Sequence, residues 1–314
     1  MKTSKKIVAL MLTIMMIFAF SGCGSNKEED TASNDQNNND TAQEQTNDNN
    51  TEADSGSETE DQNSGSEEEA ISGEVTISGS TSVEKIGNAL AEEFMALNPD
   101  VVVTYESIGS SNGVKNAKDG VTIFGTASRN LKTKEKDWGL TEVTLAFDGV
   151  AVITHPDNTI EGLTKDQVMA IYKGEIKNWN EVGGKDEEIV VVSREDGSGT
   201  RGAFEEIVDF EGALTSDAII AKGNGNVQTT VAKNPKSIGY VSFTYINETV
   251  KPMKIDGVEP LSEKVIAGEY GISRPFLMLY KSDNMTKAGE AFEKFALSTE
   301  GQNIVEEKGG IRVD

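Results

Sequence analysis

The 314-residue sequence is poor in the side chains that build metal sites and disulfides. It contains one cysteine and one histidine, which excludes an internal disulfide and leaves little for a zinc site. Basic residues are also scarce, since 29 Lys and Arg stand against 53 Asp and Glu, for a net charge of −24. Nucleic-acid backbones need basic protein surfaces, so this balance argues against a nucleic-acid partner. We expect no metal and no cofactor.

Long hydrophobic runs are absent except at the N-terminus. Residues 7–20 are apolar apart from Thr13, and three lysines precede them. This run is too short to span a bilayer comfortably and is typical of a signal peptide. It ends in Ser-Gly-Cys at Cys23, which resembles the bacterial lipoprotein processing site. The resemblance implies that 1–22 is a signal peptide and that Cys23 is lipidated, which would hold the protein on a membrane.

The segment that follows lacks the apolar residues needed for a core. Residues 24–73 contain 15 acids against Lys27 alone, no aromatic residue, and Ile71 as the one aliphatic side chain larger than alanine. Such a segment cannot bury enough apolar surface to offset the entropy of ordering. We expect 23–73, with Cys23 at its start, to be a disordered acidic linker. The remaining 241 residues, 74–314, are long enough to bury a sizeable core.

Strand and helix patterns alternate along residues 74–314. Apolar runs predict strands, and apolar residues at helical spacing or capping patterns predict helices. The expected strands are 75–78, 101–105, 122–125, 149–153, 188–193, 238–243 and 276–280. The expected helices are 83–97, 114–118, one after a capping box at Thr164, one through 203–207, one capped by Asn226, 286–297 and 299–308. This alternation predicts an α/β protein with a mostly parallel sheet flanked by helices.

Three turns share the order strand, then glycine with serine or threonine, then helix. They are Gly79–Ser82, Gly109–Gly113 and Asp196–Thr200. Each offers backbone N–H groups where a helix dipole favours negative charge. One such turn alone is more simply an ordinary helix cap. Three of them at the carboxyl ends of predicted strands favour a binding site for a small oxyanion.

The third turn contains the most informative side chain, Arg194, at the end of an apolar strand. Arginine presents a rigid fork of donors that suits tetrahedral oxyanions. Ser198, Gly199 and Thr200 can donate N–H and O–H bonds to the same anion. Asp196 follows two residues after the arginine, and an ion pair between them would fix the loop and orient the guanidinium.

Four motifs resemble the phosphate-binding lipoproteins of bacterial high-affinity phosphate uptake transporters. They are Ser80-Thr81-Ser82, the segments 108–115 and 124–129, and the Asp-Gly-Ser-Gly-Thr turn of 196–200. The resemblance implies a two-lobed periplasmic-binding-protein-like fold of type II, with lobe I at 74–154 plus 275–314 and lobe II at 155–274. It also implies a lipid-anchored, monomeric, non-enzymatic receptor outside the cytoplasm. That receptor would close on inorganic phosphate and deliver it to an ABC transporter permease with its ATPase.

The resemblance also assigns site residues. The implied phosphate ligands are Thr81, Ser82, Ser110, Ser128, Arg194, Ser198, Gly199 and Thr200, with Ser80, Arg129 and Asp196 in support. In this scheme Asp196 is the acid that holds Arg194. Some relatives place an aspartate after the third strand to accept the proton of hydrogen phosphate, where this chain has Arg129.

Asp148 is the candidate that would replace the missing acceptor, and the alternative is that it is a simple turn aspartate. A buried carboxylate that accepts the ligand's proton would reject sulphate, which carries none at neutral pH.

Other functions stay open at this point. The ligand of a related binding protein could be molybdate, tungstate or sulphate. A serine hydrolase would use Ser198 as nucleophile, but this mechanism needs a positioned base, and the single histidine, His155, precedes a proline at a predicted strand end. An adhesive or sensory lipoprotein that binds another protein is a third reading.

Overall fold

The structure is a computed structural model that describes residues 70–314. The predicted signal peptide, Cys23 and nearly all of the predicted linker lie outside these residues. The first strand, β1, begins at Gly73, the last residue assigned to the linker, and Ile71 already packs against the core. No helix within 70–314 combines the length and the apolar character that crossing a membrane requires.

The first part of the described chain builds one end of the main sheet. Strand β1 (Gly73–Gly79) lies between β2 (Val101–Ser107) and β3 (Phe124–Ala127) and pairs with both in parallel. Helices α1 (Glu84–Leu97) and α2 (Ser110–Asp119) connect these strands. The C-terminal helices α8 (Lys287–Ala296) and α9 (Thr299–Glu307) pack beside them.

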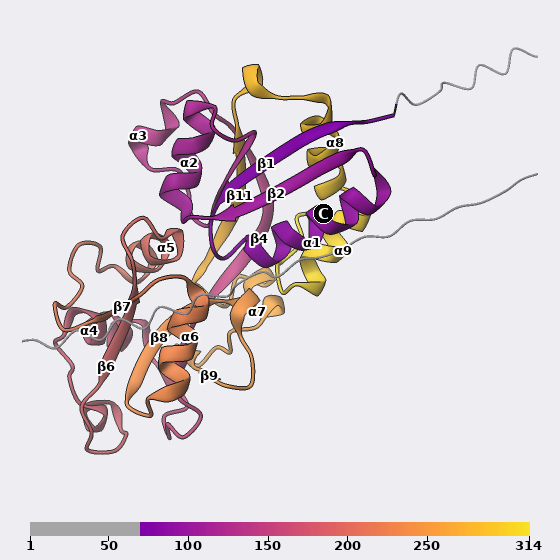
Figure 1. The fold of residues 1–314 in the computed structure, drawn as a ribbon. Helices are drawn as coiled ribbons and strands as arrows, with labels where there is room; N and C mark the ends of the chain where they lie inside the picture. The colour runs from indigo at the N-terminus through magenta and orange to yellow at the C-terminus, as the bar shows by residue number, and fades with distance from the viewer. Residues whose placement is uncertain (1–69) are drawn as a thin grey trace, which may run out of the picture. The chain divides into compact units, whose positions relative to one another are not determined.

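Two long antiparallel strands cross from this end of the sheet to the other. Strand β11 (Ser273–Tyr280) pairs with β3 and with β4 (Thr141–Thr154). Strand β4 pairs with β11 as far as Gly149 and with β8 (Ser237–Ser242) from Val150 onward. Figure 1 shows β4 and β11 running between the two groups of elements. Strands β4 and β11 therefore join the two ends of the sheet.

The other end of the sheet also combines parallel strands with connecting helices. Strand β6 (Val190–Arg194) pairs in parallel with β8 and with β7 (Ile219–Ala221). Helices α4 (Lys165–Lys173), α5 (Gly199–Val208) and α6 (Asn224–Lys233) accompany these strands. The predicted mixed sheet flanked by helices at each end is confirmed, with parallel pairings among its outer strands and antiparallel pairings along β4 and β11.

Short elements complete the chain. They are α3 (Thr133–Lys136), β5 (Gly162–Leu163), the 3₁₀ turns η1 (Trp179–Val182), η2 (Phe243–Tyr245) and η3 (Ser282–Asn284), β9 (Lys251–Pro252), β10 (Lys254–Ile255) and α7 (Ser262–Ile266). Strand β9 pairs with β4, and β10 pairs with β5 in a separate small sheet.

Buried apolar side chains form separate clusters at the two ends. One cluster takes its members from 150–272, and the larger of the other two takes them from 75–146 and 276–305. Two cores on one sheet are what a two-lobed protein requires. The exact residues at which the predicted lobes divide stay a prediction.

Most predicted elements are present, although β7 and the short elements above were not predicted. The capping box at Thr164 is confirmed, because its hydroxyl accepts from the Gln167 backbone and the Gln167 side chain accepts from the Thr164 backbone. The predicted cap of α6 at Asn226 is wrong, since α6 begins at Asn224 after Gly223, whose φ of 79° suits glycine. The first half of β4 was not predicted, although Val143, Leu145 and Phe147 alternate with smaller or polar residues.

Candidate functional site

Four helices begin at one polar site between the two ends of the sheet. Thr81 and Ser82 precede α1, Ser110 opens α2, and Ser198 caps α5 by accepting from the Arg201 backbone. The Ser82 and Thr200 hydroxyl oxygens lie 2.9 Å apart, and the Ser111 backbone N–H donates to the Gly197 carbonyl at 3.1 Å. The three predicted turns are thus in contact, and α6 adds a fourth helix start that was not predicted.

Gly79 joins the first two turns. Its carbonyl accepts from the backbone N–H groups of Ile108 at 2.9 Å and Gly109 at 2.7 Å. Its φ of 146° is a conformation that other residues rarely adopt, and a Cβ there would collide with Thr126. Glycine is required at position 79 because the end of β1 lies directly against the end of its neighbouring strand, β3.

Gly199 lets the third turn approach the second. The Ser110 hydroxyl accepts from the Ser128 backbone N–H at 3.1 Å, and the two serine hydroxyls lie 3.4 Å apart. A Cβ on Gly199 would collide with both hydroxyls. All three residues are buried, so the start of α5 packs its bare backbone against two hydroxyl groups.

Arg194 has the most informative unpaired hydrogen-bond donor of the site. Its side chain is 1% exposed, and Nε and Nη2 donate to the two carboxylate oxygens of Glu195, each at 2.8 Å. Nη2 also donates to the Thr81 hydroxyl at 3.1 Å. Nη1 is buried without any partner, a state it shares with only the Gln228 side-chain nitrogen within 70–314. A buried guanidinium nitrogen without an acceptor is costly, which makes Nη1 a candidate donor to a bound ligand.

Glu195 holds this arginine, and the prediction that Asp196 does so is wrong. Partial burial disfavours the Glu195 carboxylate, but the bonds and charge of Arg194 outweigh it and hold the Glu195 pKa below its usual value. The Asp196 side chain is 98% exposed and accepts from Arg201 at 2.8 Å. Arg194 is the last residue of β6, so the alternation of side chains along a strand no longer predicts which following residue faces it.

Asp148 is fully buried, and its carboxylate is surrounded by protein donors. One oxygen accepts from Nε and Nη2 of Arg274, at 3.1 and 2.9 Å. The other accepts from the Ser242 hydroxyl at 2.9 Å and the Phe243 backbone at 3.1 Å. Burial raises the Asp148 pKa to about 6, against the opposing charge of Arg274. These four bonds fill its acceptor positions, so the structure does not support Asp148 as the acceptor of a ligand's proton.

Arg274 was not predicted, although it connects Asp148 to the site. It is 3% exposed, its Nη1 donates to the Ser128 carbonyl at 3.0 Å, and its Nη2 donates to the Ser82 hydroxyl at 3.1 Å. The available signal was an arginine directly before the apolar strand predicted at 276–280. A charged residue there has to be paired if it is buried.

Asn224 was also missed, because the sequence analysis placed the helix cap two residues later, at Asn226. It is fully buried and is the first residue of α6. Its side-chain nitrogen donates to the hydroxyls of Thr81 at 3.1 Å and Ser82 at 2.9 Å. It therefore bridges the start of α6 to the start of α1.

Two predicted supporting residues lie behind the site. The Ser80 hydroxyl accepts from the Ser82 backbone at 3.1 Å and so shapes the first turn. Arg129 forms a buried ion pair with Glu135 at 2.7 Å and donates to the Ser111 hydroxyl at 3.3 Å. Arg129 therefore steadies the second turn from outside, and its charge is already paired.

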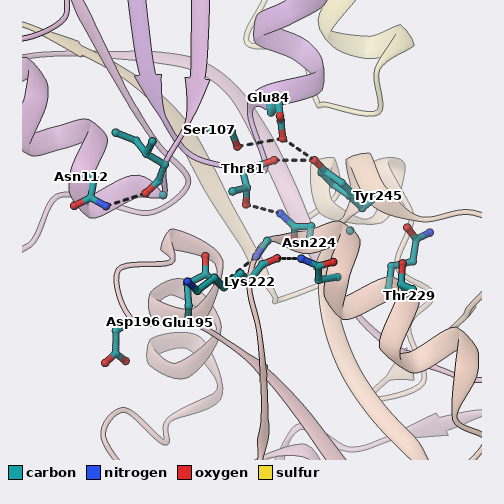
Figure 2. Close-up of a pocket in the computed structure, with 16 residues that line it drawn as sticks. Thr81, Glu84, Ser107, Asn112, Glu195, Asp196, Lys222, Asn224, Thr229 and Tyr245 are labelled. Atoms are coloured by element: carbon teal, nitrogen blue, oxygen red, sulfur yellow. Dashed lines mark hydrogen bonds between the residues drawn. The ribbon is translucent and has the colours of Figure 1, made fainter. Parts of the chain in front are cut away.

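A cleft of about 800 Å³ adjoins the site, and Figure 2 shows its lining. Thr81 and Asn224 form its deep wall, and Tyr245 lies beside Glu84, with its hydroxyl 3.1 Å from the Thr81 carbonyl. Asp196 lies at the rim, and its carboxylate points away from Thr81 and Asn224 (Figure 2). The cleft gives the polar site a route to solvent.

Comparison with known proteins places this fold and site in a defined class. A family model described as a PBP superfamily domain matches residues 57–300. The chain therefore belongs to this superfamily of two-lobed binding proteins, which confirms the predicted fold class.

Individual relatives narrow the class. The chain is 33% identical over 239 residues to the phosphate-binding protein PstS of Bacillus subtilis strain 168, covering 70% of this chain and 79% of that protein. A Clostridium perfringens protein, described as a phosphate ABC transporter substrate-binding protein and solved with bound phosphate, is 50% identical with a TM-score of 0.76. That match covers 77% of this chain and all of the other.

An ABC-type phosphate transport receptor from Vibrio cholerae is 35% identical, with a TM-score of 0.67 over 76% of this chain and 100% of that one. The chain thus belongs to the PstS family of phosphate-binding proteins, and the family predicted from its motifs is confirmed.

Proposed function

We propose that this protein captures inorganic phosphate in the site between the two ends of its sheet and delivers it to an ABC transporter permease and its ATPase. The observation that carries the proposal is Nη1 of Arg194, a buried charged donor with no partner in the protein. It lies among helix starts and hydroxyl groups, which together suit a small tetrahedral anion. Relatives described as phosphate-binding proteins support the choice of ligand.

The proposed ligands come from the three predicted turns, together with Ser128 and Arg194. They are Thr81, Ser82, Ser110, Ser128, Arg194, Ser198, Gly199 and Thr200, supported by Ser80, Arg129, Glu195, Asn224 and Arg274. Asp148 acts through Arg274 in this proposal, because its own oxygens are occupied. At neutral pH it is ionised and balances the Arg274 charge.

Calorimetric titration of the ligand-free protein tests the proposal. Phosphate should bind, and sulphate, molybdate and tungstate, the oxyanions left open by the sequence, should bind more weakly. A preference for molybdate or tungstate would reassign the protein to another oxyanion. Arsenate, a protonated tetrahedral anion like phosphate, is the matched positive control.

A hydrolase finds little support in the site. Ser198 accepts from the Arg201 backbone as a helix cap. The Nδ1 atom of His155, the only histidine of the chain, accepts from the Asp157 backbone in the segment after β4. A serine nucleophile needs a base within hydrogen-bond reach, and no contact of His155 reaches Ser198. We therefore propose a binding protein without enzymatic activity.

We also propose that the protein is a monomer held by lipid on Cys23 at the outer face of the cytoplasmic membrane. The lysine-rich start, the short apolar run and the Ser-Gly-Cys sequence support export and lipidation. In this proposal the lobes comprise about 74–154 with 275–314, and about 155–274. Cys23→Ala should abolish incorporation of labelled palmitate into the protein, and labelling that persists in the variant would contradict the anchor.

A further inference from the structure

Two hydroxyl groups of the site have both of their acceptor positions occupied by protein nitrogens. The Thr81 hydroxyl oxygen accepts from Arg194 Nη2 and from Asn224, each at 3.1 Å. The Ser82 hydroxyl oxygen accepts from Asn224 at 2.9 Å and from Arg274 Nη2 at 3.1 Å. A hydroxyl has two lone pairs and one proton, so each of these groups has only its proton left to offer.

Asn224 is common to both hydroxyls. Its amide nitrogen has two hydrogens, and each is directed at one of them. Its amide oxygen accepts from the Ser242 backbone N–H at 3.1 Å, which fixes which end of the amide faces the hydroxyls. The side chain is fully buried, so water does not compete for these bonds.

We infer that Asn224 is a positioning residue for anion binding: it forces the Thr81 and Ser82 hydroxyls to act as donors toward the bound anion. The inference rests on the proposed function and adds a residue that acts through other residues rather than on the anion. With both lone pairs occupied, Ser82 donates its proton to the Thr200 hydroxyl 2.9 Å away, which leaves the Thr200 proton for the anion, so Ser82 acts on the anion through Thr200. No acceptor other than a ligand is in place for the Thr81 proton among the contacts of residues 70–314.

Because Asn224 and the two hydroxyls belong to opposite ends of the sheet, Asn224 can orient the hydroxyls only when the site is closed. Asn224 belongs to α6, which packs on β8 and β6, whereas Thr81 and Ser82 follow β1. Separating the two ends of the sheet would break both bonds and free the hydroxyls to turn. The site therefore acquires its full set of donors only when α6 meets the first turn.

The decisive variant is Asn224→Asp, which keeps the size and the oxygen that accepts from Ser242. A carboxylate only accepts, so the Thr81 and Ser82 protons would turn toward it and away from the anion. Its matched control is Asn226→Asp, which adds the same charge two residues along α6. Asn226 is exposed and donates to the Lys222 carbonyl, without contact to either hydroxyl.

Phosphate titration calorimetry should show a loss of about 100-fold in affinity for Asn224→Asp and less than about threefold for Asn226→Asp. Equal losses in the two variants, with wild type still binding phosphate, would overturn the role of Asn224 alone. Failure of the wild-type protein to bind phosphate would instead overturn the proposed function.

A second measurement covers the case in which Asn224→Asp does not fold, as judged by thermal melting. Asn224→Ala should weaken phosphate binding about tenfold in the wild-type background and by less than about twofold in a background that already carries both Thr81→Val and Ser82→Ala. Such non-additivity is expected if Asn224 acts through the two hydroxyls. Additive losses would mean that Asn224 only supports the fold, and the inference would be wrong.

Discussion

Two buried arginines, Arg194 and Arg274, donate to the first turn of the site. They differ in whether every guanidinium nitrogen has a hydrogen-bond partner. Arg274 has partners for all three guanidinium nitrogens, in Asp148, the Ser128 carbonyl and the Ser82 hydroxyl. Arg194 binds Glu195 and the Thr81 hydroxyl with two nitrogens and leaves Nη1 without a partner. The same side chain is thus fully paired within the protein in one place and has an unpaired donor in the other.

Their carboxylate partners differ in the same way. Asp148 is fully buried, whereas the Glu195 side chain is 22% exposed beside the cleft. Loss of an arginine would leave Asp148 as a buried unpaired charge, but water could reach Glu195. The Arg274 pair is therefore expected to matter for stability and the Arg194 pair for binding.

The largest effect is expected for Asp148→Asn. This variant leaves the Arg274 charge buried without its counter-ion, and it should lower the free energy of unfolding by about 3–5 kcal/mol. Urea denaturation at pH 7 measures this. The ratio of phosphate to sulphate affinity should stay unchanged, because the Asp148 oxygens are occupied by protein donors. A large fall in that ratio would instead indicate that Asp148 accepts the ligand's proton.

Arg194→Gln should have the next largest effect, on binding rather than on stability. It removes the unpartnered charged donor, and phosphate affinity should fall about 100-fold, or about 3 kcal/mol. The free energy of unfolding should change by less than about 1 kcal/mol, since Glu195 is partly hydrated. Calorimetry and urea denaturation on the same sample separate the two. A stability loss like that of Asp148→Asn would erase the distinction between the arginines.

Glu195→Gln should weaken phosphate binding about tenfold, because a neutral amide orients the Arg194 guanidinium less firmly. The Glu195 pKa is lowered in the folded protein, so its contribution to stability is present above about pH 4.5 and is lost as the pH falls below that value. Denaturation between pH 6 and pH 3 should therefore show a shallower loss of stability in the variant. An identical pH profile would contradict the assignment of Glu195 as the partner.

Asp196→Asn is the matched control and should have the smallest effect. The side chain is 98% exposed, and its ion pair with Arg201 lies on the surface. Such pairs contribute about 0–1 kcal/mol, so phosphate affinity should stay within about twofold of wild type. A loss as large as that of Glu195→Gln would reinstate Asp196 as the acid that serves Arg194.

These residues also show how far sequence reasoning reaches. The turns before α1, α2 and α5 were predictable because glycine, hydroxyl and helical spacing are local patterns. Arg194 was predictable because it ends an apolar strand within such a turn. The α/β class followed from the local alternation of strands and helices, whereas the two-lobed fold was implied by the resemblance of four motifs to a known family.

The missed residues depend on contacts between distant segments. Asn224 and Arg274 reach Ser82 over 142 and 192 positions of the chain, and no local pattern encodes such pairing. The choice between Glu195 and Asp196 depended on the direction of one side chain where β6 ends. Local chemistry therefore predicted where the anion site lies, but not which residues orient its donors.

The bare backbone of Gly199 sets a mechanical limit on this receptor. A methyl group there would enter the space held by the Ser110 and Ser128 hydroxyls, which belong to the opposite side of the site. The Ser110 hydroxyl accepts from the Ser128 backbone N–H and cannot move aside without breaking that bond, so the methyl would push the two sides of the site apart. Gly199→Ala would thus give a receptor that cannot close fully. Such a variant would be useful for asking whether the transporter recognises the open or the closed form.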